Sequence, residues 1–126
     1  MNKRTVLAHC VHLSDEERVL IQKTGTKIAH CATSNMKLAD GAAPVVDYLN
    51  RGIEVGLGTD SLLSNNNLDI LEAMKIALLL QRVIQKKADA LVAVQMLKMA
   101  TIDGAKVLGL SEEIGSLEKG KKLIFV

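Results

Sequence analysis

The sequence predicts an α/β protein with a parallel sheet, and two features of the chain support this. Three short β-compatible runs, at residues 5–9, 26–30 and 53–57, alternate with stretches of helical pattern. Strands that alternate with helices at this spacing form right-handed βαβ units. The third run, IEVGL, is apolar along most of its length, which suits a strand that is buried on both faces.

Helices are expected between and after these strands, at 14–24, 44–51, 68–85, 90–100 and 103–108. The first has the clearest boundaries: Ser14 and Glu17 form a capping box, and Gly25 is a usual residue just past a helix end. Asn66 or Asn67 is expected to cap the long third helix. We predict loops at 31–42 and 61–67, and a strand that begins at 122 and runs to 126.

Composition narrows the class of protein. The 126 residues suit one domain, and 48% are apolar although only one Phe, one Tyr and no Trp occur, so the core must be aliphatic. The net charge of +2 is scattered, without the basic patch and stacking aromatics of a nucleic-acid-binding protein. Charged and polar residues interrupt the longest apolar stretch, so no membrane span is expected. Two cysteines without a signal peptide indicate a cytoplasmic protein.

Three βα units do not make a closed barrel, which needs about eight strands. A three-stranded parallel sheet on its own would leave two bare edges, and bare edges promote association. We therefore expect the chain to be part of a larger structure, or to associate through these edges.

Polar side chains end each of the three predicted strands: His9, His30 and Asp60. Functional side chains of parallel α/β folds gather at the carboxyl ends of the strands. A single histidine at such a position is often only structural. Three polar groups at three successive strand ends favour a site that handles a metal-activated water.

Two other kinds of site fit the sequence less well. Cys10 and Cys31 each follow a histidine, but the spacing has neither C-x₂-C nor H-x₃₋₅-H, so a zinc finger is not expected and both thiols are interpreted as small buried groups. Gly56 and Gly58 follow a strand, as in a dinucleotide-binding loop. The third glycine of that motif is absent, which weakens the match.

Five ordered segments resemble the C-terminal part of the amidohydrolase superfamily: AHCVHLSDEE, IAHCATSNMKLADGAAPV, GLGTDSLLSNNNLDILEAMKIALLLQ, MATIDGAKVLGL and EIGSLEKGKK. The chain is most similar to the branch of 5-methylthioadenosine/S-adenosylhomocysteine deaminases, with guanine deaminase and triazine chlorohydrolases as relatives. The resemblance implies part of a (β/α)₈ TIM barrel, made of the last three βα units and C-terminal helices over residues 1–110. Residues 111–126 would be a shortened connection to a small β-sandwich, with the start of one strand.

The resemblance also implies roles for individual residues. His9 matches the sixth-strand histidine that hydrogen-bonds the attacking water, and Asp60 matches the eighth-strand aspartate that ligates the metal and shuttles a proton. The metal would be zinc, with iron as the alternative. His30, Ser34 and Asn35 fall in the seventh-strand loop, which here reads HCATSN in place of HNPTSN. His30 and Asn35, with Ser64 and Asn65, are candidates for contacts to a small-molecule substrate.

The family's other metal ligands, a first-strand H-x-H and a fifth-strand His, have no counterpart, because residues 1–8 contain no His. We therefore expect an incomplete metal site and a chain that is inactive alone. It would be a fragment of a purine-type or adenosine-thioether deaminase that needs its N-terminal part or oligomerises. The alternatives are a non-catalytic module that pairs with a complementing chain or with itself, and a small α/β binding protein that kept the scaffold and lost the chemistry.

Overall fold

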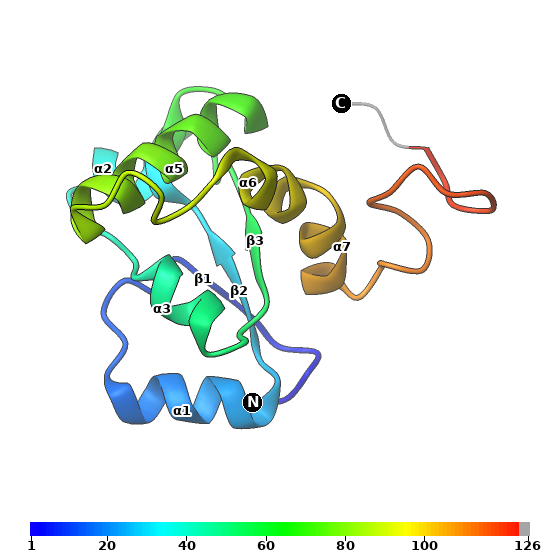
Figure 1. The fold of residues 1–126 in the computed structure, drawn as a ribbon, viewed down its shortest axis with the longest axis horizontal. Coiled ribbons are helices and arrows are strands. Elements are labelled where there is room, and N and C mark those ends of the chain that lie inside the picture. Colours follow the sequence, from blue (N-terminus) through cyan, green and yellow to red (C-terminus); the bar gives the residue numbers. More distant parts are fainter. Residues whose placement is uncertain (124–126) are drawn as a thin grey trace.

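The structure is a computed structural model that describes residues 1–123. Three strands alternate with helices, and four further helices follow the last strand (Figure 1). The elements are β1 (Val6–Ala8), α1 (Asp15–Thr24), β2 (Lys27–His30), α2 (Ala32–Lys37), α3 (Val45–Asn50), β3 (Val55–Leu57), α4 (Leu62–Asn65), α5 (Ile70–Gln85), α6 (Ala93–Ala100) and α7 (Ile102–Leu108).

The strands form one parallel sheet in the order β1-β2-β3, which confirms the predicted α/β class and strand direction. Ile28 pairs with Leu7 on one side and Val55 on the other, so these three side chains share a face. Ile28 and Val55 belong to the aliphatic core, with Tyr48 of α3 and Met96 of α6. All three strands therefore end at the same edge of the sheet.

Capping residues at both ends explain where α1 begins and ends. The Ser14 hydroxyl accepts a hydrogen bond from the Glu17 N–H at 3.2 Å, and the Glu17 carboxylate accepts one from the Ser14 N–H at 2.7 Å. Gly25 ends the helix with φ +65°. The capping box and the C-terminal glycine are as predicted, because both depend only on neighbouring residues.

Helix α7 crosses β3 at a pair of glycines. A Cβ atom at Gly56 would lie 3.0 Å from the Gly104 Cα atom and 3.3 Å from Val107 Cγ2. A side chain at Gly56 would crowd these atoms, so the glycine lets α7 pack closely on the sheet.

The structure differs from the prediction in two loops and at the start of the long helix. The predicted loop at 31–42 contains α2, which begins without a side-chain cap and so has no local start signal. The predicted loop at 61–67 contains the single turn of α4. The long helix α5 starts after Asp69, not after an asparagine, because the Asp69 carboxylate accepts hydrogen bonds from the N–H groups of Leu71 and Glu72.

The predicted strand at 122–126 lies partly outside the described residues, and Lys122 and Leu123 are not in a strand.

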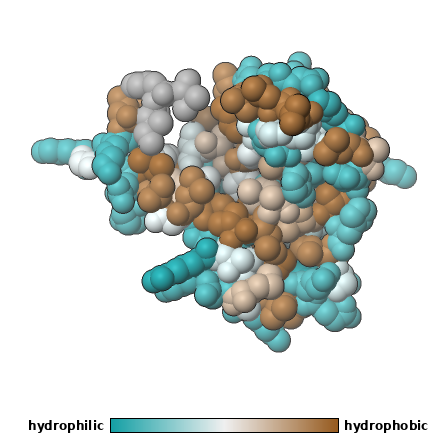
Figure 2. Space-filling view, turned by 180° about the vertical axis from the view of Figure 1, so that it is seen from behind, coloured by the Kyte–Doolittle hydropathy of each residue, from teal (hydrophilic) through white to brown (hydrophobic). Residues whose placement is uncertain are grey.

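Over residues 1–123, no helix is both long and apolar enough to cross a bilayer. Several aliphatic side chains of α5 are exposed, among them Leu71 and Val83. Figure 2 shows apolar residues in a band across the side of the molecule opposite to the view of Figure 1.

Candidate functional site

His9 and Asp60 follow β1 and β3 and come together at the carboxyl edge of the sheet. His9 Nε2 lies 3.8 Å from Asp60 Oδ2, and both side chains are about one-third exposed (39% and 31%). Both residues have φ of 64°, in the left-handed region that non-glycine residues rarely adopt. Backbone strain of this kind clusters at functional sites, where the surrounding structure holds it in place.

Hydrogen bonds hold Asp60 in its ionised form. The Ser34 hydroxyl donates to Asp60 Oδ2 at 2.6 Å, and the Ser61 N–H donates to Oδ1 at 2.8 Å. The pKa of the Asp60 carboxyl is lowered, most by the Ser34 hydroxyl, then by the nearby Ser64 hydroxyl and by the Ser61 N–H. Asp60 is therefore a carboxylate at neutral pH.

A residue of α2 also holds His9. The Asn35 Oδ1 atom lies 2.7 Å from His9 Nδ1, and the Asn35 side chain is fully buried. Ser34 and Asn35 are thus two consecutive buried residues, one of which contacts Asp60 and the other His9.

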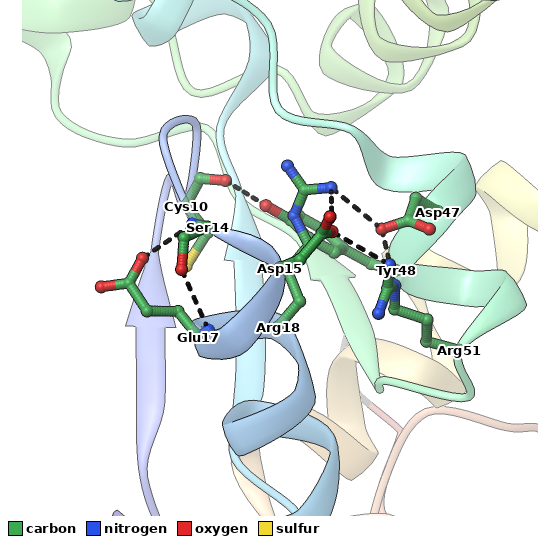
Figure 3. Close-up of polar contacts among 8 residues, drawn as sticks. All are labelled: Cys10, Ser14, Asp15, Glu17, Arg18, Asp47, Tyr48 and Arg51. Atoms are coloured by element: carbon green, nitrogen blue, oxygen red, sulfur yellow. Dashed lines mark hydrogen bonds and ion pairs between the residues drawn. The ribbon is translucent and has the colours of Figure 1, made fainter.

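Tyr48 of α3 holds the loop that carries His9 through a hydrogen bond to the residue after His9. The buried Tyr48 hydroxyl donates to the Cys10 carbonyl at 2.5 Å (Figure 3). Cys10, like His9, has a positive φ, of 51°. The hydrogen bond from Tyr48 satisfies a buried carbonyl next to the strained turn, and so stabilises the position of His9.

His30 ends β2 between the other two strands and is fully buried. Burial lowers the pKa of His30 to about 4, and the neighbouring His9 adds to this effect. Neither ring nitrogen has a hydrogen-bond partner within residues 1–123. His30 therefore lies beside His9 as a neutral ring.

Ser64 and Asn65 belong to α4, directly after Asp60. The Ser64 hydroxyl donates to the Ser61 carbonyl at 3.2 Å, and the Asn65 side-chain amide donates to the Thr59 carbonyl at 2.7 Å. Lys37 of α2 donates to the Leu63 carbonyl at 2.7 Å. These contacts fix the loop that carries Asp60; direct substrate contacts of Ser64, Asn65, His30 and Asn35 stay predictions.

Both cysteines are free and buried. Burial raises the pKa of each thiol to about 11, and at Cys31 the charge of Asp60 adds to the effect. A Cβ atom at Gly58 would lie 3.1 Å from Cys31 Sγ, so the glycine makes room for this sulfur. As protonated thiols, both groups are poor nucleophiles.

Asp60 fits one position of a metal site. Its carboxylate is ionised, as a metal ligand must be, and each oxygen accepts one hydrogen bond, which leaves lone pairs free. Among the described residues, however, no group of three or more His, Cys, Asp or Glu side chains is close enough together to hold a metal ion. A metal at this edge would need ligands in addition to those of residues 1–123.

Sequence reasoning did not assign a role to Ser34, although it contacts Asp60 directly. The available signal was its position next to Asn35 in the segment HCATSN, which follows a predicted strand. The contact itself joins residues 26 positions apart, so no local pattern reveals it.

The structure thus places a histidine and a hydrogen-bonded carboxylate together at the carboxyl edge of a parallel α/β sheet. Residues 1–126 match the amidohydrolase family, and the chain belongs to this family.

Its relatives include a 5-methylthioadenosine/S-adenosylhomocysteine deaminase of Desulforudis audaxviator, 48% identical over 121 residues that cover 96% of this chain and 28% of the relative. A 5′-deoxyadenosine deaminase of Methanobrevibacter smithii is 50% identical over 117 residues, which cover 93% of this chain and 27% of that protein. The chain thus spans little more than a quarter of the length of these relatives.

Solved structures agree with the sequence comparison. An adenosine deaminase from Xanthomonas campestris with bound zinc has a TM-score of 0.90 and 36% identity, and the match covers 95% of this chain and 27% of that one. Guanine deaminase of E. coli has a TM-score of 0.88 and 32% identity, with 96% and 27% coverage. The backbone arrangement of the present chain is therefore that of one part of such an enzyme.

Proposed function

We propose that this chain forms the part of a metal-dependent aminohydrolase active site that carries His9 and Asp60. The complete enzyme would remove an amino group from a purine-type or adenosine-thioether substrate. Its fold would be a (β/α)₈ barrel to which β1, β2 and β3 contribute the last three strands. The observation that carries the proposal is the pairing of His9 with Asp60, each hydrogen-bonded by a buried residue of α2.

The reaction replaces the bond between a ring carbon and its exocyclic amino nitrogen by a C–O bond: one water is consumed and ammonia leaves. A divalent cation, zinc or iron, would supply hydroxide at neutral pH by lowering the pKa of a coordinated water. Asp60 would hold this cation, accept the proton of the attacking water and deliver it to the leaving amino group. His9, 3.8 Å from Asp60, would orient the attacking water.

The remaining metal ligands would come from polypeptide outside this sequence, in the same protein or in a complementing chain. This follows from the lack of a three-ligand cluster within residues 1–123 and from the 26–28% of its relatives that the chain spans.

A chimera tests the proposal. In the deaminase of Desulforudis audaxviator, the region that matches this chain would be replaced by the residues of this chain. We expect the chimera to bind zinc and to release ammonia from S-adenosylhomocysteine or 5-methylthioadenosine. His9→Ala and Asp60→Asn should each lower kcat by about 10²–10⁴-fold, the usual contribution of a group that transfers or orients a proton.

Two exposed residues of the same types provide matched controls, and His12→Ala and Asp89→Asn should leave the rate unchanged. If the chimera kept full activity with both His9→Ala and Asp60→Asn, the assignment of these residues would be wrong.

A second candidate function is a non-catalytic module that associates through its open sheet. A largely apolar cavity of about 430 Å³ lies between the sheet, α7 and the C-terminal segment, lined among others by Val6, Ala29, Gly56, Leu108 and Leu117. It contains none of the predicted site residues. A chimera that folds, binds zinc and releases no ammonia would favour this second function.

A further inference from the structure

The hydrogen bond between His9 and Asn35 determines which ring nitrogen carries a proton. The amide oxygen of asparagine can only accept, so the His9 nitrogen that faces Asn35 Oδ1 at 2.7 Å must donate. In a neutral imidazole only one nitrogen carries hydrogen. A donor at Nδ1 therefore leaves Nε2 with a free lone pair.

This free nitrogen faces Asp60. His9 Nε2 lies 3.8 Å from Asp60 Oδ2, which is beyond hydrogen-bond distance. The ionised carboxylate has no hydrogen to donate. Two proton acceptors thus lie side by side at the carboxyl edge of the sheet, and both are partly open to solvent.

We propose that Asn35 is a positioning residue that fixes His9 as the Nδ1–H tautomer and so reserves Nε2 as a proton acceptor beside Asp60. The role of this nitrogen in catalysis rests on the proposed function, whereas the assignment of the His9 tautomer does not. With Nε2 free, His9 can accept a hydrogen bond from the attacking water while Asp60 takes its proton.

Three features make Asn35 suited to this role. Its side chain has no exposed surface, so it acts through His9. It is held in α2, where the Asn35 N–H donates to the Cys31 carbonyl at 3.1 Å. Its neighbour Ser34, equally buried, holds Asp60, so a single helical turn sets the position of both groups.

The tautomer can be measured directly in the ¹⁵N-labelled chain. Long-range ¹H–¹⁵N correlation spectra distinguish protonated from unprotonated ring nitrogens, and the chain has only three histidines to assign. The spectra would be recorded at alkaline pH, where imidazoles are neutral. We expect the Nδ1–H form at His9 and the mixture typical of a free ring at the exposed His12, which serves as internal reference.

Three variants separate the role of Asn35 from general packing. Asn35→Asp retains an acceptor oxygen and should keep the Nδ1–H form. Asn35→Leu has a similar size but no acceptor, and should shift His9 to the mixture seen at His12. Asn50→Ala removes an exposed asparagine at the end of α3 and should change nothing.

The Nε2–H form at His9 in the unsubstituted chain would overturn the proposal, whether or not any variant folds. An unchanged His9 tautomer in a folded Asn35→Leu chain would overturn it as well. Because the measurement needs neither metal nor substrate, its failure is distinct from the failure of the chimera to release ammonia.

Discussion

The neutral, buried ring of His30 should make the stability of the fold depend on pH in a way that can be calculated. Burial, with a smaller effect of His9, lowers the pKa of His30 from 6.5 to about 4. In the unfolded chain the ring regains an ordinary pKa of about 6.5. The folded state therefore binds this proton less readily than the unfolded state does.

The direction of this pH dependence follows from the linkage between proton binding and folding. A histidine with a depressed pKa in the folded state contributes its full stability above the unfolded pKa, and this contribution is lost as pH falls from 6.5 through 4. The two pKa values give a loss of about 2 kcal/mol between pH 7 and pH 5, and of about 3 kcal/mol by pH 4.

Urea unfolding followed by circular dichroism at several pH values measures this loss. Other groups also titrate below pH 6, so the informative quantity is the difference between the unsubstituted chain and His30→Leu, which fills the site with a non-titrating side chain. We expect this difference to change by about 2 kcal/mol from pH 7 to pH 5.

His12→Gln is the control, because His12 is exposed and its replacement should leave the pH dependence unchanged. If the unsubstituted chain and His30→Leu lost the same free energy of unfolding between pH 7 and pH 5, His30 would not be a neutral buried ring in the folded state.

Three further predictions concern other parts of the fold. Tyr48→Phe removes the hydrogen bond to the Cys10 carbonyl and should lower the free energy of unfolding by about 1–3 kcal/mol in urea titrations; no change would mean that the carbonyl finds another donor. Burial raises the pKa of both thiols to about 11, so iodoacetamide at pH 8 should modify Cys10 and Cys31 slowly in the folded chain and rapidly in urea. Equal rates of modification in the two states would contradict their burial. The exposed apolar side chains beside the cavity should cause the chain to self-associate, which sedimentation experiments would detect. The double substitution Leu108→Ser and Leu117→Ser should reduce this association. A monomeric unsubstituted chain would refute the prediction.

The sequence predicted what depends on neighbouring residues. The three strands, the Ser14 capping box and the glycine at the end of α1 were predictable because periodicity and caps are local. The place of His9 and Asp60 at one edge followed from the rule that parallel strands align their carboxyl ends. The 3.8 Å separation agrees with that expectation.

Long-range contacts account for most of what the sequence did not predict. Helix α2 has no side-chain cap, and its contacts with other elements include Ser34 to Asp60 and Lys37 to the Leu63 carbonyl. The left-handed backbone of His9 and Asp60 also has no local signal, since neither is glycine. His30 and Asn35 are buried because helices pack over the sheet, and no local sequence pattern indicates this packing.

The adjacency of Ser34 and Asn35 also constrains how this segment can vary in length. One residue inserted or deleted between β2 and Ser34 would turn both side chains by about 100° around the axis of α2, since the helix has 3.6 residues per turn. Both partners, Asp60 and His9, would then be released together. Insertions after Lys37, where the chain runs exposed to Gly41, would leave the pair in register. Natural variants of this segment should therefore conserve its residue spacing up to Asn35 more strictly than the identity of its outward-facing residues.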